Sequence, residues 1–560
     1  MKKIILCLAL VFTLPVSANS QMAIAAPDSY SSDVGMAIMK RGGNAIDAAI
    51  AVQFALAVTL PEAGNIGGGG FMLIHTPEGN DFIDYREMAP ARAHRDMYLD
   101  EEGNPRRLQS LYDSLASGVP GTVAGMWLAH QRHGSLPWAE LVEPAVRLAE
   151  DGFVVHPKLA RNVARFMERM AKRELDLNFP EYFGHVEAGE KFVQPELALT
   201  LKRIRDLGPD GFYKGKTAKI IAEFMRNNNG LITEADLANY VAVAREPIQT
   251  QWREYTLLSA PPPSSGGIAV TQWLKMYDIL APRIYNDEGK STPLYPHNSA
   301  PYVHLLAEIG KRVFADRAEY LGDPDFFDVP VAELIKDEYI AMRASGVKRN
   351  GISDTEKMKP GLPESEDTTH FSIIDAQGNA VSNTTTINLG FGSGIVVEGA
   401  GFLLNNEMDD FSVKPGVPNF FGAVGGEANA IVPKKRMLSS MTPSIVLDSN
   451  NAVKVVTGSP GGTTIISSVY QSILHVLEYG MSAQEAVDVP RFHHQLLPKD
   501  DIRHHQGMAE ETIEALEEMG YNVRESRFGD IHLLAVTDNG IDAASETNGR
   551  GKAQVALAQQ

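Results

Sequence analysis

The sequence predicts an α+β fold in which β-sheets are covered by layers of helices. Residues 120–245 and 300–345 mostly show helical periodicity, whereas the chain from residue 368 onward alternates strands with glycine-rich turns. Because a sheet must bury its apolar faces against another layer, this succession of strands and helices favours layered packing. The charged, proline-containing linker at residues 347–366 is the best candidate boundary.

The first residues predict export. Lys2-Lys3 precedes the apolar run 4–16, which is too short to span a bilayer, and Val16-Ser17-Ala18 offers a small-residue cleavage site. We therefore interpret residues 1–18 as a signal peptide, and expect a periplasmic or secreted protein. The alternative is a buried N-terminal strand.

Composition excludes several kinds of chemistry. The single cysteine, Cys7, lies within the predicted signal, so the mature chain has no disulfide, no thiolate nucleophile and no cysteine-ligated zinc. A nucleophile must be serine, threonine, lysine or a carboxylate. The net charge of −19 argues against nucleic acid and anionic membrane as partners, and an acidic substrate would need a local cation.

The N-terminal elements follow from periodicity and stop signals. We expect a helix over residues 31–41, capped by Ser31 or Ser32 and ended by glycines. The most apolar segment, residues 45–60, contains Asp47 and is short, so it predicts a core helix and no membrane anchor. After four glycines, a hairpin of residues 71–75 and 82–86 places Arg86 at the end of its returning strand.

Later elements are predicted in the same way. We expect strands at 254–261, 371–374, 381–387 and 453–457, and helices at 268–280, at 463–478 and within 300–345.

The loop Gly458-Ser459-Pro460-Gly461-Gly462 feeds a helix N-terminus, where free N–H groups suit an oxyanion. It lacks the lysine of a P-loop and the spacing of a dinucleotide-binding loop. Taken alone, it is equally well explained as a tight turn that needs glycine.

Three further stretches are ambiguous when each is taken alone. Ser439-Ser440 precedes a strand and is typical of a cap or turn, and residues 405–411 form a polar loop without EF-hand spacing. Thr368-Thr369 opens a strand that threonine favours anyway. If the chain were cut before Thr368, its α-amine, with a pKa of about 7.7–8.0, would supply a general base beside its own hydroxyl.

Together these motifs resemble the γ-glutamyltransferases, also called glutathione hydrolases, of the N-terminal-nucleophile hydrolase superfamily. The resemblance extends from about residue 21 to about residue 545. It is carried by Gly64–Phe71, Arg86–Pro90, Pro261–Gly267, Thr368–His370, residues 402–411, Ser439–Met441 and Gly458–Gly462.

The resemblance implies a four-layer αββα sandwich built from two chains after self-cleavage between Asp367 and Thr368. Residues 19–367 would form the large subunit and residues 368–560 the small subunit of a heterodimer, with no cofactor and no metal. The implied reaction cleaves the γ-glutamyl amide of glutathione and related compounds. A γ-glutamyl ester on the threonine would then pass to water or to an amino acid or dipeptide.

The resemblance also implies a role for each site residue. Thr368 would be the nucleophile, Thr386 would hold its hydroxyl, and Gly461 and Gly462 would form the oxyanion hole. The substrate α-carboxylate would be bound by Arg86, Ser439 and Ser440, and its α-amino group by Asn388, Glu407 and Asp410. Arginine is the planar, bidentate partner that a carboxylate needs, and it supplies the expected local cation.

The chain departs from the family pattern at three places. Glu407 stands where bacterial members often have glutamine. Residues 414–427 match the substrate lid, but Phe421 stands where relatives often have tyrosine. Ser545-Glu546-Thr547 replaces the usual Asp-Pro-Arg.

Two rival functions stay open at this point. One is a cephalosporin (glutaryl) acylase-like hydrolase on the same fold, which Arg86 and the lid disfavour. The other is an uncleaved, inactive binding protein on the same scaffold.

Overall fold

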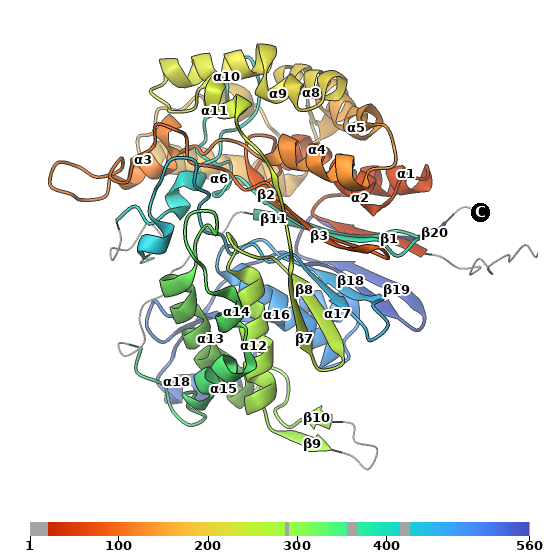
Figure 1. The fold of residues 1–560 in the computed structure, drawn as a ribbon, viewed down its shortest axis with the longest axis vertical. Coiled ribbons are helices and arrows are strands. Elements are labelled where there is room, and N and C mark those ends of the chain that lie inside the picture. The colour runs from red at the N-terminus through yellow and green to blue at the C-terminus, as the bar shows by residue number, and fades with distance from the viewer. Residues whose placement is uncertain (1–20, 286–290, 356–367, 415–425, 559–560) are drawn as a thin grey trace, which may run out of the picture.

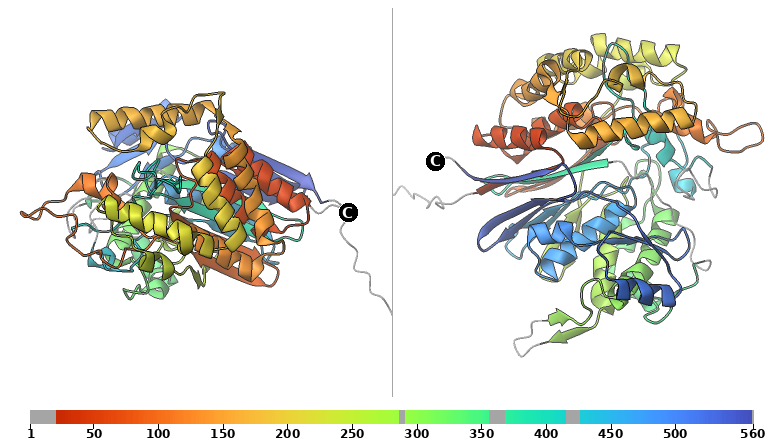
Figure 2. Two further views of the ribbon diagram at one scale, coloured as in Figure 1. Left: turned by 90° about the horizontal axis from the view of Figure 1, so that it is seen from above. Right: turned by 180° about the vertical axis from the view of Figure 1, so that it is seen from behind.

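Four layers are stacked in the order helices, sheet, sheet, helices in the computed structural model of the chain (Figure 1). The structure describes residues 21–285, 291–355, 368–414 and 426–558. Seen from behind, both sheets again lie between the two helical layers (Figure 2). The expected αββα sandwich is confirmed.

The first sheet has seven strands in the order β20-β1-β11-β12-β2-β3-β6, and every neighbouring pair is antiparallel. Its strands are β1 (Gln21–Ala26), β2 (Gly69–Thr76), β3 (Gly79–Asp84), β6 (Val243–Arg245), β11 (Thr368–Ile374), β12 (Ala380–Thr386) and β20 (Lys552–Leu557).

The second sheet has six antiparallel strands in the order β19-β18-β14-β13-β8-β7. Its strands are β7 (Ile248–Trp252), β8 (Tyr255–Ser259), β13 (Ser444–Leu447), β14 (Val453–Thr457), β18 (His532–Thr537) and β19 (Gly540–Ser545). Three small sheets lie outside these two: β4 (Phe153–Val154) with β5 (Lys191–Phe192), β9 (Arg283–Tyr285) with β10 (Ser291–Pro293), and β15 (Phe492–His494) with β16 (Asp501–His504) and β17 (Asn522–Glu525).

One helical layer covers the first sheet and the other covers the second (Figure 1). The first layer includes α1 (Ser29–Lys40), α2 (Ala45–Thr59), α4 (Thr122–His133), α5 (Trp138–Asp151), α6 (Pro157–Lys172), α8 (Pro195–Leu207) and α10 (Gly215–Asn227). The second includes α12 (Gly266–Leu280), α13 (Ala300–Tyr320), α15 (Asp337–Ser345), α16 (Thr464–Leu477), α17 (Ala483–Asp488) and α18 (Glu510–Glu518). None of the helices in these described ranges has the length and apolar character needed to cross a membrane.

The strands of the first sheet divide their side chains between two apolar cores. Met72 and Ile74 of β2 join the core beneath the first helical layer, whereas Phe71 and Leu73 join the core of the second sheet and its helices. This alternation follows from the two-residue period of a strand. The first sheet is therefore buried on both faces.

Both sheets combine strands from the two sides of the predicted cut, and the first sheet interleaves them. In the first sheet, the β11–β12 hairpin lies between β1 and β2, and β20 lies beyond β1. In the second, β7 and β8 extend a set of strands that all come from after residue 368. The linker at 347–366 consequently does not separate two independently packed domains.

Most predicted elements are confirmed to within a few residues, but the cap of α1 was predicted wrongly. Asp28, in an extended conformation, accepts a hydrogen bond from the backbone N–H of Ser31 at 2.7 Å, so α1 begins before the serines expected to cap it. Ser31 and Ser32 are themselves buried in the helix. The core helix α2 is buried along its whole length, with Asn44 and Asp47 forming its capping box.

Candidate active site

Thr368 is the first residue of β11 and lies directly opposite Thr386, the last residue of β12. Its Oγ1 donates a hydrogen bond to Thr386 Oγ1 over 3.5 Å. Thr386 Oγ1 also accepts the backbone N–H of Asn388 at 2.8 Å. Asn388 has a φ of 73°, so the chain turns sharply just after β12. Thr368, Thr386 and Asn388 are thus brought together.

A single row of residues crosses the sheet from Thr368 to Arg86. Thr386 pairs with Gly69 of β2. Gly70 and Tyr85 exchange backbone hydrogen bonds of 3.4 and 3.0 Å, which places Arg86 opposite Gly69. Three strand spacings give about 14 Å between the backbones at the two ends of the row.

The row faces the second sheet. The side chain of the preceding residue, Thr385, points to the opposite face of the sheet, toward the first helical layer. Its hydroxyl accepts hydrogen bonds from Gln53 of α2 and from Asn65. At the centre of the row, a Cβ on Gly69 would come within 2.5 Å of Glu87 Oε2 and of the Tyr85 carbonyl oxygen. Gly69 has no side chain, and the Glu87 carboxyl and the Tyr85 carbonyl oxygen fill the position that a Cβ would take.

Arg86 is fully buried in a cluster of carboxyl groups. Its Nη1 contacts the Glu407 carboxylate and its Nη2 contacts that of Asp410. Its Nε donates to the carbonyl oxygen of Met437 at 3.3 Å, and its Nη2 donates to that of Leu438 at 3.2 Å. These carbonyl groups hold the guanidinium plane beside Ser439, the next residue in the chain.

One guanidinium serves three buried carboxyls, since Glu87 Oε2 also lies 3.9 Å from Arg86 Nη1. Burial raises the pKa of Glu87, Glu407 and Asp410, and the attraction of Arg86 only partly offsets it. The same carboxylates outweigh burial at the arginine and raise its pKa, so it stays charged. The cluster is therefore short of positive charge and suited to receive an ammonium group.

The other predicted binding residues surround this cluster. Asn388 donates from Nδ2 to the carbonyl oxygen of Asn406 at 2.9 Å, which places it next to Glu407. Ser439 Oγ accepts the N–H of Met441 at 3.1 Å, whereas the buried Ser440 Oγ has no hydrogen-bond partner among the residues that the structure describes. The Ser440 hydroxyl is thus available to a ligand.

The glycine loop lies beside Thr368. Gly461 and Gly462, with φ values of 125° and 56°, precede α16, and a Cβ on Gly461 would come within 2.2 Å of the Thr464 hydroxyl. Pro460 lines a cavity of about 150 Å³ that Thr368 also lines. Both glycines are required by backbone conformation, and their role as an oxyanion hole stays a prediction.

Sequence reasoning assigned no role to two buried groups near Arg86. Glu87 lies within the Arg86–Pro90 motif, so the sequence itself indicates that it is close to the site. Arg317 of α13 gave none: its Nε donates to Ser265 Oγ at 2.9 Å, and it interacts electrostatically with Asp410. Only the packing of α13 against the 261–267 segment brings it to the site.

Some predicted features lie outside the described residues, namely Asp367 and most of the lid, including Phe421.

Glu546, in the stretch that departs from the family pattern, lies within the described residues. Its carboxylate pairs with buried Arg491 and accepts the N–H of Ile531 at 3.0 Å.

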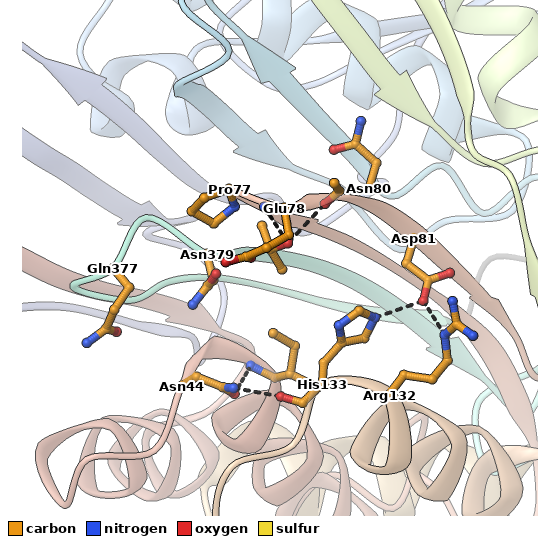
Figure 3. A pocket seen from close by; sticks show the side chains of 12 residues that line it. Asn44, Pro77, Glu78, Asn80, Asp81, Arg132, His133, Gln377 and Asn379 are labelled. Atoms are coloured by element: carbon orange, nitrogen blue, oxygen red, sulfur yellow. Dashed lines mark hydrogen bonds and ion pairs between the residues drawn. The ribbon is translucent and has the colours of Figure 1, made fainter.

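A larger cavity, of about 620 Å³, lies at the opposite end of the first sheet, by the β2–β3 and β11–β12 turns (Figure 3). Asp81 accepts a hydrogen bond from Arg132 Nε at 2.5 Å, and His133 Nε2 lies 2.8 Å from the same oxygen. None of the predicted site residues lines this cavity.

Known proteins resemble the chain along almost its whole length. The sequence model of the family described as Gamma-glutamyltranspeptidase matches residues 31–556. The glutathione hydrolase proenzyme of Pseudomonas aeruginosa is 51% identical over 536 residues, which cover 94% of this chain and 93% of that protein.

Solved structures agree. A gamma-glutamyltranspeptidase from Pseudomonas nitroreducens, complexed with L-DON, is 49% identical, with a TM-score of 0.56 over 60% of this chain and 97% of that one. A cephalosporin acylase from Bacillus halodurans superposes with a TM-score of 0.82 over 99% of this chain and 100% of its own, but at 24% identity it shows the fold alone. The extent of the sequence match and the shared architecture place this chain in the gamma-glutamyltranspeptidase family.

Proposed function

We propose that the protein is a self-processing γ-glutamyltransferase and glutathione hydrolase with Thr368 as its nucleophile. One observation carries the proposal: Thr368, Thr386 and the carboxylate-binding candidate Arg86 lie in one row on the same face of one sheet. An extended γ-glutamyl group would reach from the threonine hydroxyl toward the guanidinium, past Gly69, which has no side chain, and the Glu87 carboxyl beside it.

Processing would come first. Cleavage between Asp367 and Thr368 would free the α-amine of Thr368 and give subunits of residues 19–367 and 368–560. The two chains would stay together as a heterodimer, because both contribute strands to both sheets. Removal of the signal peptide, residues 1–18, would accompany export to the periplasm or medium.

The chemistry then follows from the neighbours of Thr368. Its hydroxyl oxygen would attack the γ-carbonyl carbon while its α-amine takes the hydroxyl proton. The N–H groups of Gly461 and Gly462 would stabilise the negative charge on the carbonyl oxygen, and the amine would return the proton to the leaving group. The resulting ester would be attacked by water, giving glutamate, or by the amine of an amino acid or dipeptide.

Recognition of the donor would be shared between two groups. Arg86, with Ser439 and Ser440, would bind the α-carboxylate. The α-ammonium would meet Glu407 and Asp410, with Asn388 beside them. A zwitterion suits this cluster, since its ammonium supplies positive charge that three carboxyls sharing one guanidinium lack.

The test begins with a denaturing gel of the expressed full chain. The proposal expects two bands, a small chain whose N-terminal residue is Thr368, and release of glutamate from glutathione. A single full-length band without activity would instead support the uncleaved binding protein. Faster turnover of a glutaryl amide than of the matched γ-glutamyl amide would support the acylase.

A further inference from the structure

The cavity beside Thr368 lies on the opposite flank from the donor cluster. Arg86 is reached from Thr368 through β12 and β2, whereas Pro27, in the wall of the cavity, follows β1 on the other side of β11. Arg550, also in the wall, precedes β20, the next strand outward. A γ-glutamyl group bound toward Arg86 would therefore leave this flank open to a second reactant.

Four charged side chains line this cavity, two of each sign: Glu62, Asp530, Lys158 and Arg550. Arg550 and Glu62 are paired at 3.0 Å, with Arg550 almost fully buried. Lys158 and Asp530 are 3.7 Å apart, and the lysine side chain is 29% exposed, so this pair is loose. The formal charges of these four side chains sum to zero, and Lys158 is the one whose ion pair is long and partly exposed.

The carboxylates have hydrogen-bonding capacity left over. Glu62 Oε1 accepts from Asn162 at 3.3 Å, but Glu62 Oε2 is buried without a partner among the described residues. Asp530 Oδ1 is buried and unpartnered in the same sense. Buried carboxylate oxygens normally have donors, so these two atoms indicate that a ligand supplies them.

We propose that this cavity is the acceptor subsite, in which a zwitterionic amino acid or short peptide binds before it attacks the ester on Thr368. The acceptor's ammonium donates to Asp530 and Glu62, and its carboxylate pairs with Lys158. A zwitterion has zero net charge, so its binding keeps the charge of this cavity unchanged. The inference rests on the proposed function and names the second substrate's site.

The transfer step balances as follows. The acceptor ammonium first loses one proton to solvent, and its amine nitrogen then attacks the γ-carbonyl carbon. A C–N bond forms, the bond from that carbon to Thr368 Oγ1 breaks, and the second amine proton ends on Thr368 Oγ1 by way of the α-amine. Carboxylates that hold the ammonium next to Thr368 bring the nucleophilic nitrogen to the ester.

The experiment varies the acceptor and the protein together. The processed enzyme is supplied with one γ-glutamyl anilide donor, and transfer is followed with glycylglycine and with glycylglycinamide, which lacks the carboxylate. We expect wild type to show an acceptor KM roughly tenfold lower for glycylglycine, and Lys158→Met to abolish that preference by raising only the glycylglycine KM. Lys172→Met is the matched control, since this exposed lysine lies on the same helix.

Asp530→Asn tests the ammonium half. It should raise the KM for both acceptors, because both present an amine. Unchanged acceptor KM values in Lys158→Met and Asp530→Asn, in an enzyme that does transfer, would overturn the acceptor site and leave the proposed function intact. A shifted pH profile of hydrolysis without acceptor in Asp530→Asn, with unchanged acceptor KM, would assign the carboxylate to the Thr368 amine and also overturn it. Wild-type enzyme that yields neither glutamate nor γ-glutamyl dipeptide would refute the proposed function itself.

Discussion

The two ends of the seven-stranded sheet differ in the size of their cavities and in how completely their buried polar atoms are hydrogen-bonded. The end at the β2–β3 and β11–β12 turns has the larger cavity, yet the described polar side chains that line it include no buried atom without a partner. The end at Thr368 has the smaller cavity, and Glu87, Ser440, Glu62 and Asp530 all carry buried oxygens without partners among the described residues. In this molecule unmet hydrogen-bonding capacity, rather than volume, marks the site.

The strongest test of this contrast is Thr368→Ala. It removes the hydroxyl that we propose to perform both cleavage and turnover, so we expect a single full-length chain and no glutamate release. A denaturing gel and a glutamate assay measure both. A Thr368→Ala protein that still yields two chains would show that another group performs the cleavage.

Arg86→Ala should produce the next largest effect. Hydrogen bonds to charged groups contribute about 1.5–3 kcal/mol, so kcat/KM for a γ-glutamyl anilide should fall roughly ten- to 150-fold. The matched control is Arg132→Ala at the other end of the sheet, where we expect a change of less than about twofold. Equal losses in the two variants would remove the functional distinction between the ends.

Glu407→Gln should stabilise the protein as pH rises. Burial raises the folded-state pKa of Glu407, so its contribution to stability is full below the unfolded pKa of about 4.3 and is lost as pH rises through the higher folded value. Melting temperatures at pH 5 and pH 8 should therefore show a larger gain for the variant at pH 8. A gain that does not grow with pH would mean that Arg86 fully compensates the carboxylate.

Asp81→Asn should show the opposite slope and the smallest effect. Although burial raises the pKa of Asp81, its hydrogen bonds to His133 and Arg132 lower it further, for a net decrease. Its contribution is thus present above the unfolded pKa of about 3.9 and lost as pH falls through the folded value. We expect a cost of about 1 kcal/mol near neutrality that shrinks toward pH 3, measured by thermal melts. A cost that is constant with pH would refute this assignment.

The parts of the fold that local pattern determines were predictable, and the pairing of distant strands was not. Residues 45–60 are apolar on every side, which indicates a buried helix wherever the chain places it. Nothing local indicates that β11 pairs with β1, because that register depends on side chains more than 300 residues apart in sequence. A local motif likewise identifies Arg86 as a site residue, whereas Arg317 comes close to it only through the packing of distant segments, which no local pattern indicates.

The interleaved hairpin has a consequence for how the enzyme is made. While the chain is continuous, folding is a first-order reaction of one molecule. In the proposed processed form, cut before Thr368, β11 and β12 of one chain would have to insert between β1 and β2 of another, so recovery from denaturant would become a second-order reaction that slows on dilution. The uncut Thr368→Ala chain should regain its structure at any concentration. The separated parts of the processed enzyme would then regenerate it poorly, and its working lifetime would be set by its rate of unfolding.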